Sequence, residues 1–299
     1  MTKKTALVLS GGGAKGAFQC GAEKYAREVK GYHWDIIAGV SVGALNGAML
    51  AMEKYQRLFE IWNTISNDKV YTGGFNLLSL VKLLFGAKSF YGNGPLRRML
   101  LQELEPEEIK ADLRIGAVSL ETGEYVEFRG DDPDIAEAIL ASTVMPIIWT
   151  PLDISYKHRS MVDGGVRNIS PIGDVLDAEP DEVVIINCSP EMFDPLPGPP
   201  ENILKIGERT LEILLNELFR SDMREFVRIN AMVLEAQAQG VTLHHPVSGR
   251  PLKYYPWKII EPVETLGDTL DFSQEAVQGS LKAGLERARQ VLEGVRREN

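Results

Sequence analysis

The feature that most constrains the fold of this chain is a serine between two glycines, where a short apolar run meets a helix-like segment. The serine is Ser41, in Gly39-Val-Ser-Val-Gly43, and the apolar run before it covers residues 36–38. A sharp strand–turn–helix connection crowds the positions two before and two after the serine, where glycine avoids a clash of its Cβ atom. We therefore expect a nucleophile elbow, with the Ser41 hydroxyl above the edge of a sheet at the positive end of a helix.

A second glycine-rich segment follows the first predicted strand. Residues 5–9 form a short apolar run, and Gly11-Gly-Gly-Ala-Lys-Gly16 then opens onto a predicted helix. If this strand and the strand before Ser41 are parallel neighbours, their C-terminal ends lie about 5 Å apart. The backbone N–H groups of Gly12 and Gly13 would then face the carbonyl group that Ser41 attacks, which predicts an oxyanion hole. Lys15 is expected either to face solvent or to assist a negative headgroup.

The same glycine loop leaves a dinucleotide site open as an alternative. Dinucleotide folds place an acidic residue about 20 positions after the loop, at the end of the second strand. Asp35 has nearly this spacing, but it precedes its strand, whose far end carries Ser41. A nucleotide P-loop is not indicated, because Lys15 precedes its glycine and no G-K-[ST] sequence occurs.

A serine nucleophile needs a base, and candidates of two kinds follow Ser41. Asp163 comes at the end of a predicted strand, directly before two glycines. His158 lies in a predicted hairpin turn between basic residues, and His244 and His245 lie in a polar loop. Because neither context suits a buried base, a carboxylate that acts directly on the serine is the more economical interpretation.

Composition narrows the partners and the cofactors. The 299 residues carry a net charge of −10, which argues against nucleic acid, since phosphates are bound through Lys and Arg. Four histidines and two distant cysteines predict no metal site, no disulfide and no cofactor. The first apolar run stops after five residues and no stretch of bilayer-spanning length follows. We therefore expect a cytoplasmic or peripheral membrane protein.

Residues 69–102 contain five basic residues and no acidic one, and residues 75–85 within them are strongly apolar. One interpretation is a buried core helix with lysines on its solvent side. The other is a lid over Ser41, or a membrane-contact surface that favours anionic lipid. The residues that would form this lid or contact are Phe75, Leu77, Leu78, Lys82 and Lys88.

The rest of the chain alternates between predicted strands and helices. Further strands are expected at 113–120, 125–128, 152–156, 181–187 and 254–260, and helices at 49–66, 132–141, 201–238 and after Ser273. The predicted fold class is α/β, with a mostly parallel central sheet and helices on both faces. Residues 1–190 would form a catalytic core, and residues 200–299 a mainly helical C-terminal part that packs on it.

Three motifs in this order resemble the signatures of the patatin-like phospholipase family. They are the glycine loop, the serine elbow and the tripeptide Asp163-Gly-Gly, and residues 141–146 also resemble the segment before the family's aspartate strand. Gly165 stands where many relatives carry alanine, which is a permitted variant. The motif glycines are Gly11, Gly16, Gly39, Gly43, Gly164 and Gly165.

The resemblance implies a patatin-like variant of the α/β-hydrolase fold with a Ser-Asp dyad. Ser41 would be the nucleophile, Asp163 the general base, and Gly12 and Gly13 the donors to the oxyanion. The implied reaction is hydrolysis of an acyl ester in phospholipid or another lipid, of phospholipase A or lysophospholipase type, through an acyl-enzyme and without a metal. The other interpretation is a patatin-fold scaffold that is dormant or activated by a partner.

Overall fold

A computed structural model describes most of the chain: residues 3–73, 91–92, 94–146, 148–192, 195, 198–200 and 203–294. The predicted lid or membrane-contact residues lie outside these described residues; they are Phe75, Leu77, Leu78, Lys82 and Lys88. The choice between a core helix and a contact surface for residues 75–85 therefore stays a prediction.

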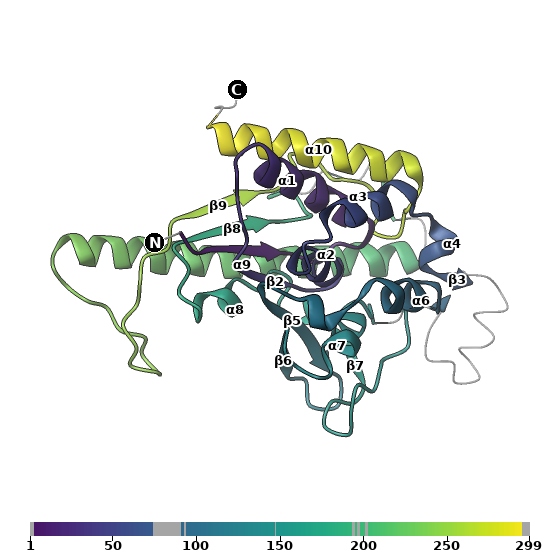
Figure 1. The fold of residues 1–299 in the computed structure, drawn as a ribbon, viewed down its shortest axis with the longest axis horizontal. Coiled ribbons are helices and arrows are strands. Elements are labelled where there is room, and N and C mark those ends of the chain that lie inside the picture. Colours follow the sequence, from purple (N-terminus) through teal and green to yellow (C-terminus); the bar gives the residue numbers. More distant parts are fainter. Residues whose placement is uncertain are drawn as a thin grey trace.

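A seven-stranded sheet lies at the centre of the molecule, in the order β6-β5-β2-β1-β8-β9 with β7 also paired to β5 (Figure 1). Five strands, β5-β2-β1-β8-β9, are parallel neighbours, whereas β6 and β7 run antiparallel to β5. The strands are β1 (Thr5–Leu9), β2 (Ile36–Gly39), β5 (Asp112–Ser119), β6 (Tyr125–Arg129), β7 (Met161–Asp163), β8 (Glu182–Ile186) and β9 (Trp257–Ile260). The predicted α/β class with a mostly parallel sheet is confirmed.

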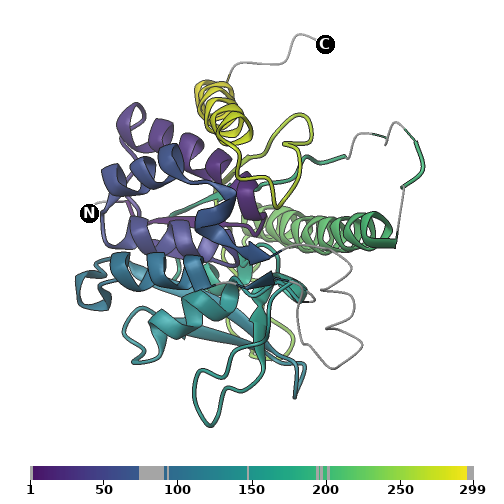
Figure 2. The same cartoon turned by 90° about the vertical axis from the view of Figure 1, so that its right-hand side faces the viewer.

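Helices cover both faces of this sheet, as Figure 2 shows from the side. Side chains alternate along a strand, so Leu7 and Leu9 of β1 join one apolar core, while Ala6 and Val8 join the other. The first core lies under α1, α2, α3, α7 and α10, and the second under α8 and α9. The helices are α1 (Gly16–Glu28), α2 (Val42–Ala51), α3 (Tyr55–Thr64), α4 (Asn67–Val70), α6 (Gly94–Glu103), α7 (Ile135–Ser142), α8 (Ile172–Leu176), α9 (Ile203–Ala238) and α10 (Gln274–Glu293). Short elements are β3 (Thr72–Gly73) paired with β4 (Tyr91–Gly92), and the 3-10 turns η1 (Gly13–Lys15), η2 (Pro106–Glu108) and η3 (Gly164–Val166).

Several predicted element boundaries are wrong for local reasons. The helix expected at 49–66 is interrupted, because Glu53 has φ 55°, a left-handed conformation that a helix cannot continue through. The helix expected from residue 132 begins at Ile135, because the Asp132 carboxylate accepts from the Asp134 N–H and forms a turn first. Where long helices were expected at 201–238, the structure has one helix of 36 residues, Ile203–Ala238.

The strand predicted at 152–156 is also wrong. Leu152 forms a single bridge to Met161. The N–H groups of Ile154 and Ser155 then donate to the carbonyl of His158, so the chain turns back on itself before a second pair can form.

Helices α1 and α10 lie side by side at one end of the layered structure (Figure 1). A Cβ atom on Gly21 would lie 2.0 Å from the carbonyl oxygen of Leu281, and one on Gly284 would lie 2.0 Å from that of Phe18. The helices therefore approach too closely for side chains at these points, and α10 fixes the position of α1. The proposed boundary between residues 190 and 200 stays a prediction.

Candidate active site

Ser41 occupies a strained turn between β2 and α2. It has φ 55° and ψ −129°, a conformation that is costly for a residue with a side chain and is found at functional sites. A Cβ atom on Gly39 would lie 2.3 Å from the Gly43 carbonyl oxygen, and one on Gly43 would lie 2.3 Å from that of Leu9. The structure has the strand–turn–helix arrangement that the sequence predicted, and a side chain at either glycine would meet backbone atoms.

The strands that carry Ser41 and Asp163 converge on one edge of β5. Strand β2 ends with Gly39 opposite Ile115, and β7 ends with Asp163 opposite Ala117. Because β2 runs parallel and β7 antiparallel to β5, while β6 takes the other edge, the C-terminal ends of β2 and β7 point at each other. Only Gly116 separates the two ends in register, so the structure brings Asp163 to Ser41.

The carboxyl group of Asp163 is buried and has neutral partners. Its Oδ1 atom accepts a hydrogen bond of 2.7 Å from the Gly165 N–H. Burial raises the pKa of Asp163 from 3.8 to about 6, while hydrogen bonding to the Ser41 side chain and to Gly165 lowers it. Burial outweighs the hydrogen bonds, and the carboxylate is a stronger base than an exposed aspartate.

The glycine loop lies against the serine turn, at the N-terminus of α1. A Cβ atom on Gly11 would lie 3.8 Å from Ser41 Oγ. The N–H of Ala14 donates to the Thr269 carbonyl at 2.8 Å, and that of Gly11 also donates to a backbone carbonyl. Gly12 and Gly13 lie between these two residues. Within the part of the chain that the structure describes, their N–H groups have no hydrogen-bond partner. These two N–H groups are free to donate hydrogen bonds to a negatively charged oxygen.

A mostly apolar pocket opens from Ser41 and Gly13, with about 820 Å³ of empty space that includes open solvent. Its polar lining comes from few side chains, among them Asn46, Thr143 and Glu103. Apolar lining residues include Val42, Leu45, Met49, Leu58, Ile61, Trp62, Ile65, Val70, Leu96, Met99, Leu100, Leu104, Met145, Trp149, Leu270 and Phe272. A lining of this kind suits a hydrocarbon chain.

Protein-family models provide an independent assignment. Residues 7–176, which are more than half of the chain, match the model described as Patatin-like phospholipase. The chain belongs to the patatin-like phospholipase family.

Among curated proteins, this patatin-like chain is similar to a cGAMP-activated phospholipase of Escherichia coli (strain TW11681), with 28% identity over 193 residues. That match covers 56% of this chain and 54% of the relative. It is also similar to YqhO of Bacillus subtilis (strain 168), with 25% identity over 188 residues that cover 55% of this chain and 64% of the relative. The matches thus span little more than half of each relative.

Two solved structures are similar at low identity. VipD from Legionella pneumophila gives a TM-score of 0.49 at 16% identity, covering 98% of this chain and 67% of that one. Human GIVD cytosolic phospholipase A2 gives a TM-score of 0.46 at 10% identity, covering 98% and 58%.

The patatin-like chain links its two candidate catalytic residues through a segment whose contacts were not anticipated from the sequence. Ser142 Oγ accepts a 2.9 Å hydrogen bond from the Ser41 N–H, and the Val144 carbonyl accepts one of 2.8 Å from the Asp163 N–H. Residues 142–144 therefore hold both turns. The only sequence signal was the resemblance of residues 141–146 to the family's segment.

A chain of buried amides holds the base of the patatin glycine loop. Gln19 Nε2 donates to the Ser10 carbonyl at 2.7 Å, and Asn46 Nδ2 donates to Gln19 Oε1 at 2.9 Å. Trp62 Nε1 completes the chain by donating to Asn46 Oδ1 at 2.9 Å. These contacts join α1, α2 and α3, and helical spacing alone did not reveal them.

The structure corrects the expectation that Lys15 of this patatin loop faces solvent or assists a headgroup. Its side chain is buried and forms an ion pair of 3.3 Å with Glu212 of α9. The ammonium group thus neither faces solvent nor lies open to a headgroup, because α9 covers it on the far side of the sheet from α2.

Cys188 and the candidate bases His158 and His245 contact other groups in this patatin-like protein. Burial raises the pKa of Cys188 to about 12, so its thiol stays neutral. The His158 ring packs edge-on against Phe128, and His245 Nδ1 accepts turn N–H groups. Among the hydrogen bonds of the described ranges, none joins a histidine to Ser41 or Asp163.

Two further findings concern the described residues only. No group of three or more His, Cys, Asp or Glu side chains in them is arranged to hold a metal ion. In the same ranges, no helix combines the length and apolar character needed to cross a membrane.

Proposed function

We propose that this chain hydrolyses carboxylic ester bonds of lipids, as a phospholipase A or lysophospholipase, with Ser41 as nucleophile and Asp163 as base. The observation that carries the proposal is the convergence of β2 and β7 on β5, which sets a buried carboxyl group of raised pKa beside a strained serine. Family membership supports the same reaction class.

The reaction proceeds in two halves. Asp163 accepts the proton of Ser41 Oγ as the oxygen attacks the ester carbonyl, and then gives this proton to the departing alcohol. The acyl group is left on Ser41. Asp163 next deprotonates a water that attacks the acyl-enzyme, and the proton returns to Ser41 as the fatty acid leaves. With a pKa of about 6, about nine-tenths of the carboxyl groups are ionised at neutral pH and ready to act as a base.

The free N–H groups of Gly12 and Gly13 would bind the oxyanion in both halves. Each well-placed donor of this kind lowers the barrier by roughly 3 to 4 kcal/mol. The neighbouring N–H groups of Gly11 and Ala14 are fixed by backbone carbonyls, so the two donors are preorganised.

Lipid is the substrate class that the pocket supports. The apolar lining would bury the acyl chain while the ester lies at Ser41, and the headgroup would stay outside. A peripheral membrane contact through residues 69–102 is proposed from charge alone. The dinucleotide alternative is weakened, because the Asp35 carboxylate accepts from the Thr5 N–H at the N-terminal ends of β1 and β2, opposite the glycine loop.

Hydrolysis of a p-nitrophenyl acyl ester tests the proposal with wild type, Ser41→Ala and Asp163→Asn. Both variants should fold, as judged by circular dichroism, and lose at least ~10³-fold in kcat/KM. Activity retained by folded Asp163→Asn would reject the dyad. A fluorophosphonate that labels wild type but not Ser41→Ala would exclude a dormant scaffold.

Because one relative is named as cGAMP-activated, the assay is run with and without cGAMP. Turnover that appears only with cGAMP would support the partner-activated alternative. Wild type that neither turns over nor reacts with the fluorophosphonate under either condition would reject the proposed function.

A further inference from the structure

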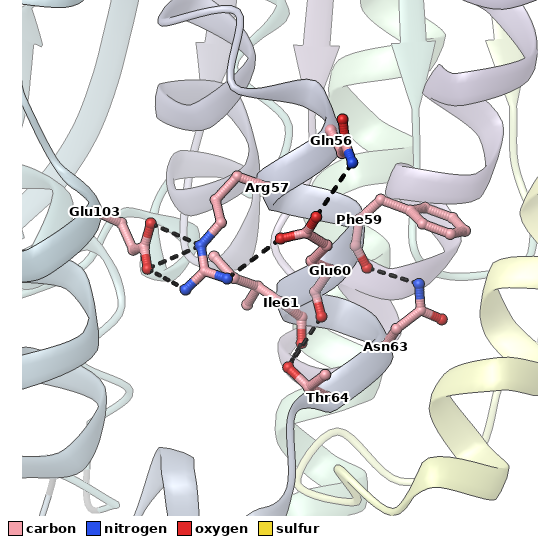
Figure 3. A network of polar contacts seen from close by, with 8 residues as sticks. All are labelled: Gln56, Arg57, Phe59, Glu60, Ile61, Asn63, Thr64 and Glu103. Carbon is pink, nitrogen blue, oxygen red and sulfur yellow. Dashed lines mark hydrogen bonds and ion pairs between the residues drawn. The ribbon is translucent and has the colours of Figure 1, made fainter.

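An ion pair between α3 and α6 involves Glu103, a residue of the pocket lining. Arg57 Nε donates to both carboxylate oxygens of Glu103 at 3.1 Å, and Arg57 Nη2 donates to Oε1 at 2.6 Å. Figure 3 shows the Arg57 side chain reaching across to Glu103, with Glu60 on its other side. Glu103 lines the pocket, although most of its neighbours there are apolar.

The position of Glu103 follows from contacts at the C-terminal end of α2. This helix begins next to Ser41 and ends at Ala51. The N–H of Glu105 contacts the Met52 sulfur at 3.5 Å, and Lys54 Nζ donates to the Glu103 carbonyl at 3.1 Å. The end of α6 therefore lies beside the end of α2, and Glu103 is separated from Ser41 by the length of that helix.

The length of α2 sets a scale for the pocket. One face of the helix lines it, from Val42 through Leu45 and Asn46 to Met49. Seven residues of helix span about 10 Å. An extended chain of single bonds advances roughly 1.2 Å per bond, so this face matches roughly eight carbon–carbon bonds before the chain meets Glu103.

An apolar chain cannot extend past this point without disturbing the ion pair. The Glu103 side chain is only 16% exposed, whereas that of Arg57 is 50% exposed. The carboxylate thus depends on Arg57 for compensation, and separating the two charges by a hydrocarbon would leave it buried and unpaired. The pair also ties α3 to α6, and Leu58 of α3 and Leu100 of α6 both line the pocket.

We propose that the Arg57–Glu103 ion pair is the end wall of the acyl site and limits the length of the acyl chain. This inference rests on the function proposed above. It assigns this protein a preference for medium-length acyl groups over long ones, with Glu103 as the residue that determines this specificity.

Two truncations with a shared partner test the proposal. Glu103→Ala removes the wall and leaves Arg57 with access to solvent and to Glu60. Glu60→Ala is the matched control, because Glu60 also binds Arg57 but is 51% exposed and does not line the pocket. Glu103→Gln keeps the volume of the side chain and loses only its charge.

The assay compares kcat/KM for p-nitrophenyl butyrate, octanoate, dodecanoate and hexadecanoate. Wild type should favour octanoate, and Glu103→Ala should raise the hexadecanoate-to-octanoate ratio by about tenfold, or 1.4 kcal/mol. Glu103→Gln should shift the ratio in the same direction by less, and Glu60→Ala should not shift it. Equal profiles for Glu103→Ala and Glu60→Ala would overturn the inference, whereas a wild type inactive on every ester would count against the proposed function.

Binding provides a readout that does not require turnover. Trp62 and Trp149 line the pocket, so fatty acids titrated into Ser41→Ala should change its tryptophan fluorescence. Octanoate should bind Ser41→Ala more tightly, relative to longer acids, than its hydrophobicity predicts. In the double variant Ser41→Ala/Glu103→Ala, the affinity should again rise with chain length. If affinity rises steadily with chain length when Glu103 is present, the pocket has no end wall there and the inference is wrong.

Discussion

Ser41 and Asp163 meet at one point, but they destabilise the fold in different ways. Ser41 adopts a strained backbone conformation, with φ 55°, whereas the backbone of Asp163 is unremarkable and its side chain is a buried carboxyl group of raised pKa. The free-energy cost of the strained backbone at Ser41 does not depend on pH, whereas the cost of burying the charge of Asp163 does. Backbone strain at Ser41 and charge burial at Asp163 are therefore independent features, which substitutions can separate.

The largest effect on stability is expected from Asp163→Asn. The pKa of Asp163 lies above its value in an unfolded chain, so wild type is relatively more stable at low pH and loses that advantage as pH rises through about 6. At neutral pH the variant should be more stable by up to about 3 kcal/mol, and at about pH 4 the gain should disappear. Urea unfolding across this range measures the difference.

The exposed Asp177→Asn is the control for general loss of charge, because its carboxylate is 70% exposed. It should leave the free energy of unfolding nearly unchanged at every pH. A gain for Asp163→Asn that is the same at low and neutral pH would show that charge burial is not its cause.

The next largest effect is expected on the pH dependence of kcat/KM. Because the base must be ionised, kcat/KM should fall about tenfold per pH unit below the pKa of about 6. Steady-state assays with an uncharged p-nitrophenyl ester would measure this limb. A rate that stays level down to about pH 4 would mean that the base titrates like an exposed aspartate.

The smallest effect tests the strain. Ser41→Gly and Ser41→Ala both remove the nucleophile, but only glycine tolerates positive φ without cost. The glycine variant should therefore be more stable than the alanine variant by about 1 kcal/mol, independently of pH. Thermal unfolding of the two variants measures the difference in stability. Equal stabilities would show that the backbone at Ser41 is not strained.

The two residues also differ in how far the sequence predicts them. The turn at Ser41 is local, because the glycines at positions 39 and 43 and the flanking apolar residues specify it within a short stretch. The placement of Asp163 depends on β7 pairing with β5 across more than forty residues. No periodicity encodes that register, and the strand predicted at 152–156 was wrong because a tight turn forms there.

Supporting side chains were the least predictable part of the site. Ser142 and Asn46 act through hydrogen bonds to groups that are distant in sequence, and a polar residue in a helix carries no mark of its partner. No motif in the sequence pointed to Glu103. The mostly parallel sheet and the helical layers were more predictable, since buried strands and amphipathic helices leave repeated patterns along the chain.

The contact between Ala14 and Thr269 has a consequence for the smallest unit that can work. The family match ends at residue 176, yet the Thr269 carbonyl holds the N–H next to the free donors, and a Cβ atom on Gly13 would lie 2.3 Å from the same oxygen. A fragment cut at the limit of the family's signature would keep every motif and still lack one wall of the catalytic loop. In this protein, the region that the family model matches is therefore shorter than the region needed to form the glycine loop.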